Sequence, residues 1–158
     1  MPGFELFGDE ERKQVNDVLG TGILMRYGFD GPRKGIWKAV ELAKAITQTF
    51  GCKHAQLVSS GTAALTTALQ GLGVGYGDEV IMPAFTFVAS FEAVISVGAT
   101  PVLVDIDDTL TLDPAAVKAA ITPKTKCIMP VHMCGSMANL DALQAIASEH
   151  RLILLEDA

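Results

Sequence analysis

The sequence is short of basic residues and has no long apolar run. Twelve Lys and Arg stand against 18 Asp and Glu among 158 residues, a formal net charge of −6. Such a chain has no general basic field to attract nucleic acid or an anionic membrane, so neither is an expected partner. No stretch is apolar enough to span a bilayer, and the acidic start MPGFELFGDEERK does not resemble a secretory signal. We therefore expect a cytoplasmic protein.

Paired cysteines are also missing. Cys52, Cys127 and Cys134 form no C-x-x-C pair and are odd in number, which is typical of free thiols in a reducing compartment. Cys127 lies inside an apolar run, so we expect it to be buried. His132 and Cys134 lack the further ligands that a metal site needs, and no metal is predicted; His132 can be an ordinary loop histidine.

What the sequence does have is an alternation of apolar patterns, with 49% hydrophobic and 19% charged residues. Period-3.6 patterns and caps predict helices at residues 8–22, 35–50, 60–72, 86–98, 113–121 and 139–150. Apolar runs predict strands at residues 54–58, 79–83, 100–105, 126–131 and 151–156. Helices between successive apolar strands predict an α/β fold with a doubly wound, mostly parallel sheet.

Two Gly-rich stretches need separate interpretation. Gly71, Gly73, Gly75 and Gly77 do not match G-x-G-x-x-G and precede a strand, so no dinucleotide site is predicted. The stretch at residues 23–35 has no clear period. Its aromatic and basic residues would serve a ligand or a partner, or form a packed irregular arm; they are Arg26, Tyr27, Phe29 and Arg33.

The motif SSGTAAL, residues 59–65, connects a predicted strand to a predicted helix. The first backbone N–H groups of a helix lack partners and lie at the positive end of its dipole, which makes this a site for a phosphate. Ser60 has a second interpretation, because serine commonly caps a helix with its own hydroxyl.

Three candidate groups fall at the carboxyl edge of the predicted sheet, where open α/β sheets bind ligands. They are Ser60-Gly61-Thr62, the stretch 84–87 with Phe87, and Asp157. Pyridoxal phosphate needs amides for its phosphate, a flat ring against its face and a carboxylate at its pyridine nitrogen. Taken singly, Phe87 can be simple core and Asp157 can cap a following helix.

Five motifs carry a family resemblance. SSGTAAL, GDEVIMPAFTFVAS, GATPVLVDID, ITPKTKCIMPVHMCG and LLEDA, in this order, resemble the N-terminal part of the DegT/DnrJ/EryC1/StrS sugar aminotransferases, fold-type I pyridoxal-phosphate enzymes. The resemblance implies that residues 1–50 are N-terminal helices and an arm. Residues 51–158 would be the N-terminal part of the cofactor-binding large α/β domain, which is then incomplete here. MPGFELFGDEE, RYGFD and VHMCGSM are more similar to the subgroup that makes 8-amino-3,8-dideoxy-manno-octulosonate, a lipopolysaccharide sugar.

The resemblance also implies site roles. It assigns the cofactor phosphate to Ser60, Gly61 and Thr62, ring stacking to Phe87, and the pyridine nitrogen to Asp157. The implied reaction moves an amino group from glutamate to a keto sugar in a homodimer. The Schiff-base lysine of the family is expected after Ala158, and the lysines at 13, 34, 38, 44, 53, 118, 124 and 126 do not match it. We thus expect no catalytic residue and no turnover from this chain alone.

Two alternatives remain from the sequence. A sugar dehydratase on the same scaffold carries histidine in place of that lysine, and a non-catalytic structural module would keep the fold without either residue.

Overall fold

The computed structural model describes residues 3–158, which divide into two compact units, Met1–Leu57 and Val58–Ala158. The division follows Leu57, and the region boundary after residue 50 that the resemblance implies stays a prediction. None of the helices in residues 3–158 is long and apolar enough to cross a membrane.

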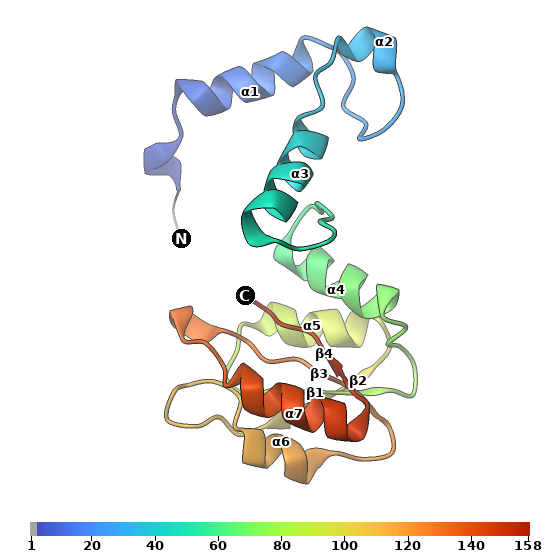
Figure 1. Ribbon diagram of the computed structural model, residues 1–158, viewed down its shortest axis with the longest axis vertical. Coiled ribbons are helices and arrows are strands. Elements are labelled where there is room, and N and C mark those ends of the chain that lie inside the picture. The colour runs from blue at the N-terminus through green and yellow to red at the C-terminus, as the bar shows by residue number, and fades with distance from the viewer. Residues whose placement is uncertain (1–2) are drawn as a thin grey trace. The chain divides into compact units, whose positions relative to one another are not determined.

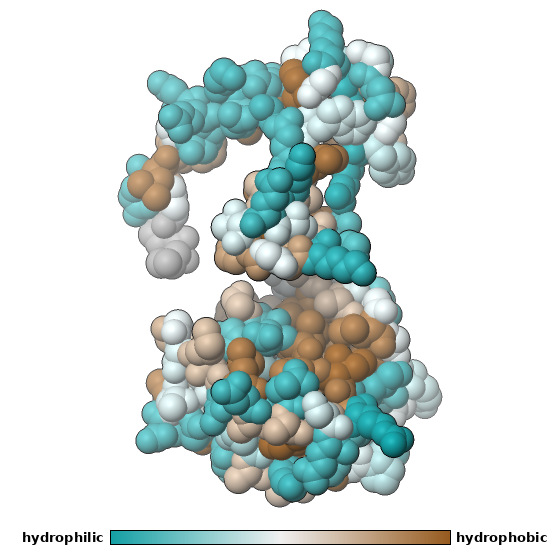
Figure 2. All heavy atoms as spheres, viewed as in Figure 1, coloured by the Kyte–Doolittle hydropathy of each residue, from teal (hydrophilic) through white to brown (hydrophobic). Residues whose placement is uncertain are grey.

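The first unit is helical (Figure 1). Its elements are η1 (Phe4–Leu6), α1 (Asp9–Leu19), α2 (Asp30–Arg33) and α3 (Lys38–Phe50). At the start of α1 the Gly8 N–H donates to Glu11 Oε2 at 2.7 Å, and acidic residues fill the first turn, where they complement the helix dipole. Gly51 ends α3 with a φ of 66°, a left-handed conformation that glycine adopts without strain. Figure 2 shows a largely hydrophilic surface over α1, which buries none of its residues.

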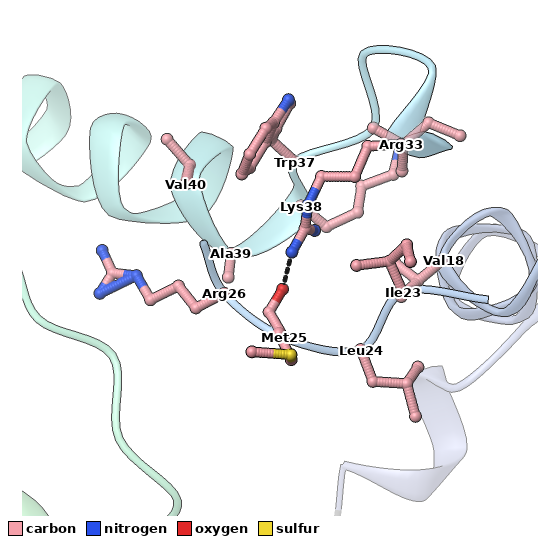
Figure 3. Close-up of a pocket in the computed structure, with 11 residues that line it drawn as sticks. Val18, Ile23, Leu24, Met25, Arg26, Arg33, Trp37, Lys38, Ala39 and Val40 are labelled. Atoms are coloured by element: carbon pink, nitrogen blue, oxygen red, sulfur yellow. Dashed lines mark hydrogen bonds between the residues drawn. The ribbon is translucent and has the colours of Figure 1, made fainter. Parts of the chain in front are cut away.

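Arg33 organises the arm between α1 and α3 (Figure 3). Its side chain is buried, with 5% of the residue exposed, and it donates to the carbonyl oxygens of Met25, Tyr27 and Gly28. The guanidinium also lies 4.2 Å from the centre of the Trp37 ring. The arm is therefore packed around a guanidinium whose hydrogen bonds are made within the arm. Arg33 thus has a structural role and is not left free for a ligand.

The second unit contains the sheet. Its strands are β1 (Glu79–Pro83), β2 (Thr100–Val104), β3 (Thr125–Ile128) and β4 (Ile153–Leu154). They pair in the order β2-β1-β3-β4, and every pair is parallel. Ile81 lies at the centre, opposite Val102 on one side and Ile128 on the other. The predicted parallel sheet is confirmed.

Helices cover both faces of this sheet (Figure 1). They are α4 (Gly61–Gly71), α5 (Val88–Ser96), α6 (Pro114–Ala120) and α7 (Leu140–His150), with a short η2 (Met133–Gly135). One core joins Leu69 of α4 and Val94 of α5 to Val80 and Met82 of β1. The other joins Val117 of α6 and Leu143 of α7 to Ile81. Successive residues of β1 thus point to opposite cores, which is why the strand is a continuous apolar run.

One predicted strand is absent. Residues 54–58 form no strand in the described chain, so that prediction is wrong. An apolar run becomes a strand only where a neighbour pairs with it. The last strand is also shorter than predicted, since β4 pairs through two residues and is followed by an isolated bridge between Val131 and Asp157.

Candidate functional site

A cavity of about 290 Å³ opens where β1 and β3 end. The chain leaves β1 through α5 on one face of the sheet and leaves β3 through α7 on the other face, so these neighbouring strands form a topological switch point. Ligands of open α/β sheets bind in this crevice. Four predicted site residues line it: Gly61, Thr62, Phe87 and Asp157. Ser60 is not among the lining residues.

The N-terminus of α4 supplies unused backbone donors to the cavity. Ser60 Oγ accepts the Ala63 N–H at 3.1 Å and thereby caps the helix, as its second interpretation proposed. The N–H groups of Gly61 and Thr62 have no acceptor among the described residues. A Cβ built at Gly61 would meet no atom within 4 Å, so the space beside this backbone is open. An anion can approach these two donors.

Phe87 lies in the turn between β1 and α5. It is 70% exposed and lines the cavity, so the alternative that it is simple core is wrong. Its backbone is extended at the N-cap of α5, where the side chain makes no capping bond. An aromatic ring at a cavity wall can stack against a flat ligand.

Asp157 is held through both its backbone and its side chain. Its N–H donates to the Pro130 carbonyl at 3.0 Å, and its carbonyl accepts the His132 N–H at 2.9 Å. Its Oδ2 atom accepts the Ser90 hydroxyl at 2.6 Å. The carboxylate therefore has a defined place in the cavity. Among the described residues no hydrogen-bond partner contacts Oδ1, so this oxygen can accept a bond from a ligand.

His132 braces the loop that follows β3. Its Nδ1 atom accepts the Ala138 N–H at 3.2 Å, and Nε2 lies 3.1 Å from Glu156 Oε2. An imidazole that accepts at Nδ1 carries its proton on Nε2, which suits a bond to a carboxylate. Within residues 3–158 no three His, Cys, Asp or Glu side chains cluster as a metal site, and no lysine lines the cavity.

One residue that contacts the site, Ser90, was missed from the sequence. Ser90 bonds Asp157, and Thr86 Oγ1 lies 3.0 Å from Ser90 Oγ. Thr86 is part of the 84–87 stretch, but Ser90 sits in an apolar helix pattern and looks like any small buried residue. Its only local signal is its spacing of four residues from Thr86, inside the helix predicted at residues 86–98; in the structure α5 begins at Val88, and Thr86 lies before the N-cap residue Phe87.

Known proteins match most of this chain. An L-glutamine:2-deoxy-scyllo-inosose aminotransferase of Streptoalloteichus tenebrarius is 49% identical over 142 residues, which is 89% of this chain and 33% of that protein. The spore coat polysaccharide biosynthesis protein SpsC of Bacillus subtilis is 43% identical, over 97% of this chain and 37% of that protein. The chain thus spans roughly a third of the length of these relatives.

Solved structures share the fold. A 3-amino-5-hydroxybenzoic acid synthase superposes with a TM-score of 0.87 at 44% identity, over 96% of this chain and 38% of that one. NtdA from Bacillus subtilis, with bound cofactor PMP, has a TM-score of 0.81 at 33% identity, over 99% of this chain and 35% of that one. Bound PMP in such a neighbour is consistent with the pyridoxal-phosphate prediction.

A model of the DegT/DnrJ/EryC1/StrS aminotransferase family matches residues 7–158. That match covers nearly the whole chain, and the fold and the relatives agree with it. This chain belongs to the DegT/DnrJ/EryC1/StrS aminotransferase family.

Proposed function

We propose that the cavity binds pyridoxal 5'-phosphate for transfer of an amino group from glutamate to a keto sugar by the whole protein. The observation that carries this proposal is the convergence of three unlike groups on one cavity: free amides at Gly61 and Thr62, the exposed ring of Phe87, and the carboxylate of Asp157. Pyridoxal phosphate has a phosphate, a flat ring and a basic ring nitrogen, and each of these meets one group.

Each residue would have a separate task. The Gly61 and Thr62 N–H groups and the Thr62 hydroxyl would bind the phosphate, supported by the dipole of α4. Ser60 would contribute its hydroxyl proton, since its oxygen already accepts the Ala63 N–H. Phe87 would lie against the ring, and Asp157 would hold a proton on the ring nitrogen. When bound, the cofactor supplies the electron sink that stabilises negative charge developing beside the amino nitrogen.

The test is Asp157→Asn in the whole protein. The amide is nearly isosteric with the carboxylate but is neutral, so it cannot hold the ring nitrogen in its charged form. We expect turnover of amino donor to fall by about 10²–10⁴-fold, in the range for loss of a group that stabilises charge in the transition state. The matched control is Asp113→Asn, which changes an aspartate that caps α6 outside the cavity. Equal loss in both variants, or none at Asp157, would refute the proposed role.

A dehydratase is the second candidate because one structural neighbour has that activity. A GDP-4-keto-6-deoxymannose-3-dehydratase superposes with a TM-score of 0.81 at 29% identity, over 96% of this chain and 39% of that one. The two reactions differ in product: transamination delivers nitrogen to the sugar, whereas dehydration removes a hydroxyl from it. Incubation with ¹⁵N-glutamate and a keto sugar, read by mass spectrometry, separates the two.

The finer substrate proposal is an 8-oxo derivative of manno-octulosonate used for lipopolysaccharide. It rests on the similarity of MPGFELFGDEE, RYGFD and VHMCGSM to that subgroup. The competing substrate is 2-deoxy-scyllo-inosose, which the name of one relative specifies together with glutamine as donor. A panel of both acceptors with glutamate and glutamine, scored by kcat/KM, tests the assignment.

We also propose a cytoplasmic homodimer. The dimer is inferred from family resemblance, and the location from the free thiols. Sedimentation of the whole protein and fractionation of the source cells check these two points.

A further inference from the structure

We propose that Ser90 is a positioning residue for Asp157 and that Thr86, Ser90 and Asp157 form a directed hydrogen-bond relay. This inference rests on the proposed function, in which Asp157 faces the cofactor's ring nitrogen. In the relay, the Asp157 carboxylate is held by Ser90 on α5, which lies outside the LLEDA motif that contains Asp157. The relay joins residues that are 67 positions apart in the chain.

The direction of the relay follows from counting protons. Ser90 has one hydroxyl proton, and its oxygen lies 2.6 Å from Oδ2 of Asp157, which can only accept when ionised. The Ser90 proton is therefore committed to Asp157. The contact between Thr86 Oγ1 and Ser90 Oγ, at 3.0 Å, must then be donated by Thr86. Each hydroxyl polarises the next, which strengthens the final bond to the carboxylate.

Burial gives this contact its weight. Ser90 is 2% exposed, so water does not replace the bond when it is lost. Ser90 also stands on α5, which is anchored in the core by Ala93 and Val94. Asp157 itself follows β4, which pairs with β3 through only two residues. A rigid helix thus fixes a side chain whose own strand is short.

The relay has a consequence for the two carboxylate oxygens. Ser90 occupies Oδ2, so Oδ1 is the oxygen left for a ring nitrogen. With its direction fixed, Oδ1 keeps its negative charge against the proton that the ring nitrogen carries. That proton then stays on the ring nitrogen, which is the state that makes the cofactor an electron sink. Without Ser90 the carboxylate would turn more freely, and its charge would no longer be held against the ring nitrogen.

The experiment uses two NMR readouts on variants of the protein. The first is the ¹³Cγ resonance of Asp157 without ligand. The second is the ring ¹⁵N resonance of labelled pyridoxamine 5'-phosphate, a probe that binds without a Schiff-base lysine. Ser90→Ala should shift the Asp157 resonance and lower the ratio of protonated to unprotonated ring nitrogen about tenfold, since a buried bond to a charged group is lost. In turnover assays kcat should fall while KM for the amino donor stays constant.

Ser96→Ala is the matched control. Ser96 is also on α5, but its hydroxyl donates to the Ala93 carbonyl at 2.8 Å and it does not line the cavity. Neither resonance should move in this variant. Ser90→Thr and Ser90→Val form a second pair of nearly equal volume, so any packing strain is shared and only Thr keeps a hydroxyl. Thr should restore both signals toward those of the unsubstituted protein, and Val should match Ala.

The outcomes separate this inference from the proposed function. If Asp157→Asn abolishes ring-nitrogen protonation but Ser90→Ala leaves both resonances unchanged, the relay is refuted and the cofactor role of Asp157 survives. If Asp157→Asn itself has no effect on the ring nitrogen, the proposed function fails, whereas a shifted Asp157 resonance in Ser90→Ala would still establish the Ser90 bond. Identical behaviour of the Thr and Val variants would also overturn the relay.

Discussion

Truncation of Leu69 tests whether α4 is held on the sheet by core packing. Leu69 is fully buried among Leu65, Val80 and Val94. Leu69→Ala removes three carbons, worth about 2.4 kcal/mol at roughly 0.8 kcal/mol for each buried methylene. The cavity that remains adds a further cost, so we expect a loss of about 3–4 kcal/mol in the free energy of opening this unit. Because α4 carries the Gly61 and Thr62 amides, the same contact supports the candidate phosphate site.

Amide hydrogen exchange at β1 measures this loss within the second unit alone. A change of about 3–4 kcal/mol corresponds to exchange of the Val80–Met82 amides that is faster by about 10²–10³-fold, at tenfold for each 1.4 kcal/mol. Leu72→Ala is the matched control, because Leu72 follows α4 and is 42% exposed. It should cost less than about 1 kcal/mol. Equal protection factors in the two variants would show that Leu69 does not anchor the helix.

Two further predictions concern ionisable groups of the second unit. Burial raises the pKa of the Cys127 thiol to about 12, so Cys127 should resist a disulfide reagent at pH 8. Cys52 and Cys134 are exposed and should react. Rapid reaction of all three thiols in the folded chain would contradict this. The Lys126 ammonium, 3.0 Å away, and then the Gly75 N–H lower the pKa of Asp78. A lowered native pKa stabilises the fold above the unfolded value of about 4 and loses that contribution as the pH falls further. Asp78→Asn should therefore cost about 0.5–1 kcal/mol at pH 7 in urea unfolding and less at pH 3, and a cost independent of pH would refute the ion pair.

The elements that the sequence predicted best are those with complete local signals. Residues 79–83 were expected as a strand, and β1 has those bounds. The apolar run that predicted the strand is buried from Val80 to Pro83. Asp113 caps α6 through its bond to the Ala115 N–H at 2.9 Å, with Pro114 in the first turn, as the Asp-Pro pair predicted. In both cases the information lies within a few consecutive residues.

The misses involve partners that are far away in the sequence. Residues 54–58 are apolar enough for a strand, but composition does not specify a neighbour to pair with, and they form no strand in the described chain. Ser90 has no local feature that points to Asp157, because their contact depends on how α5 packs across the sheet edge. For the site, the sequence placed Ser60-Gly61-Thr62, Phe87 and Asp157 at one edge of the sheet, and all of these except Ser60 line one cavity in the structure.

Strand order explains why the site can be built from such separate pieces. In the sheet, β3 lies between β1 and β4. Residues that follow β1 and residues that follow β4 nevertheless line the same cavity, which opens where β1 and β3 end. Phe87 follows β1, whereas Asp157 follows β4, which pairs with β3 through two residues. A carboxylate keeps a fixed direction when a hydrogen bond holds one of its oxygens. The Ser90 hydroxyl on α5 supplies that bond, so the helix that follows β1 orients the carboxylate that follows β4.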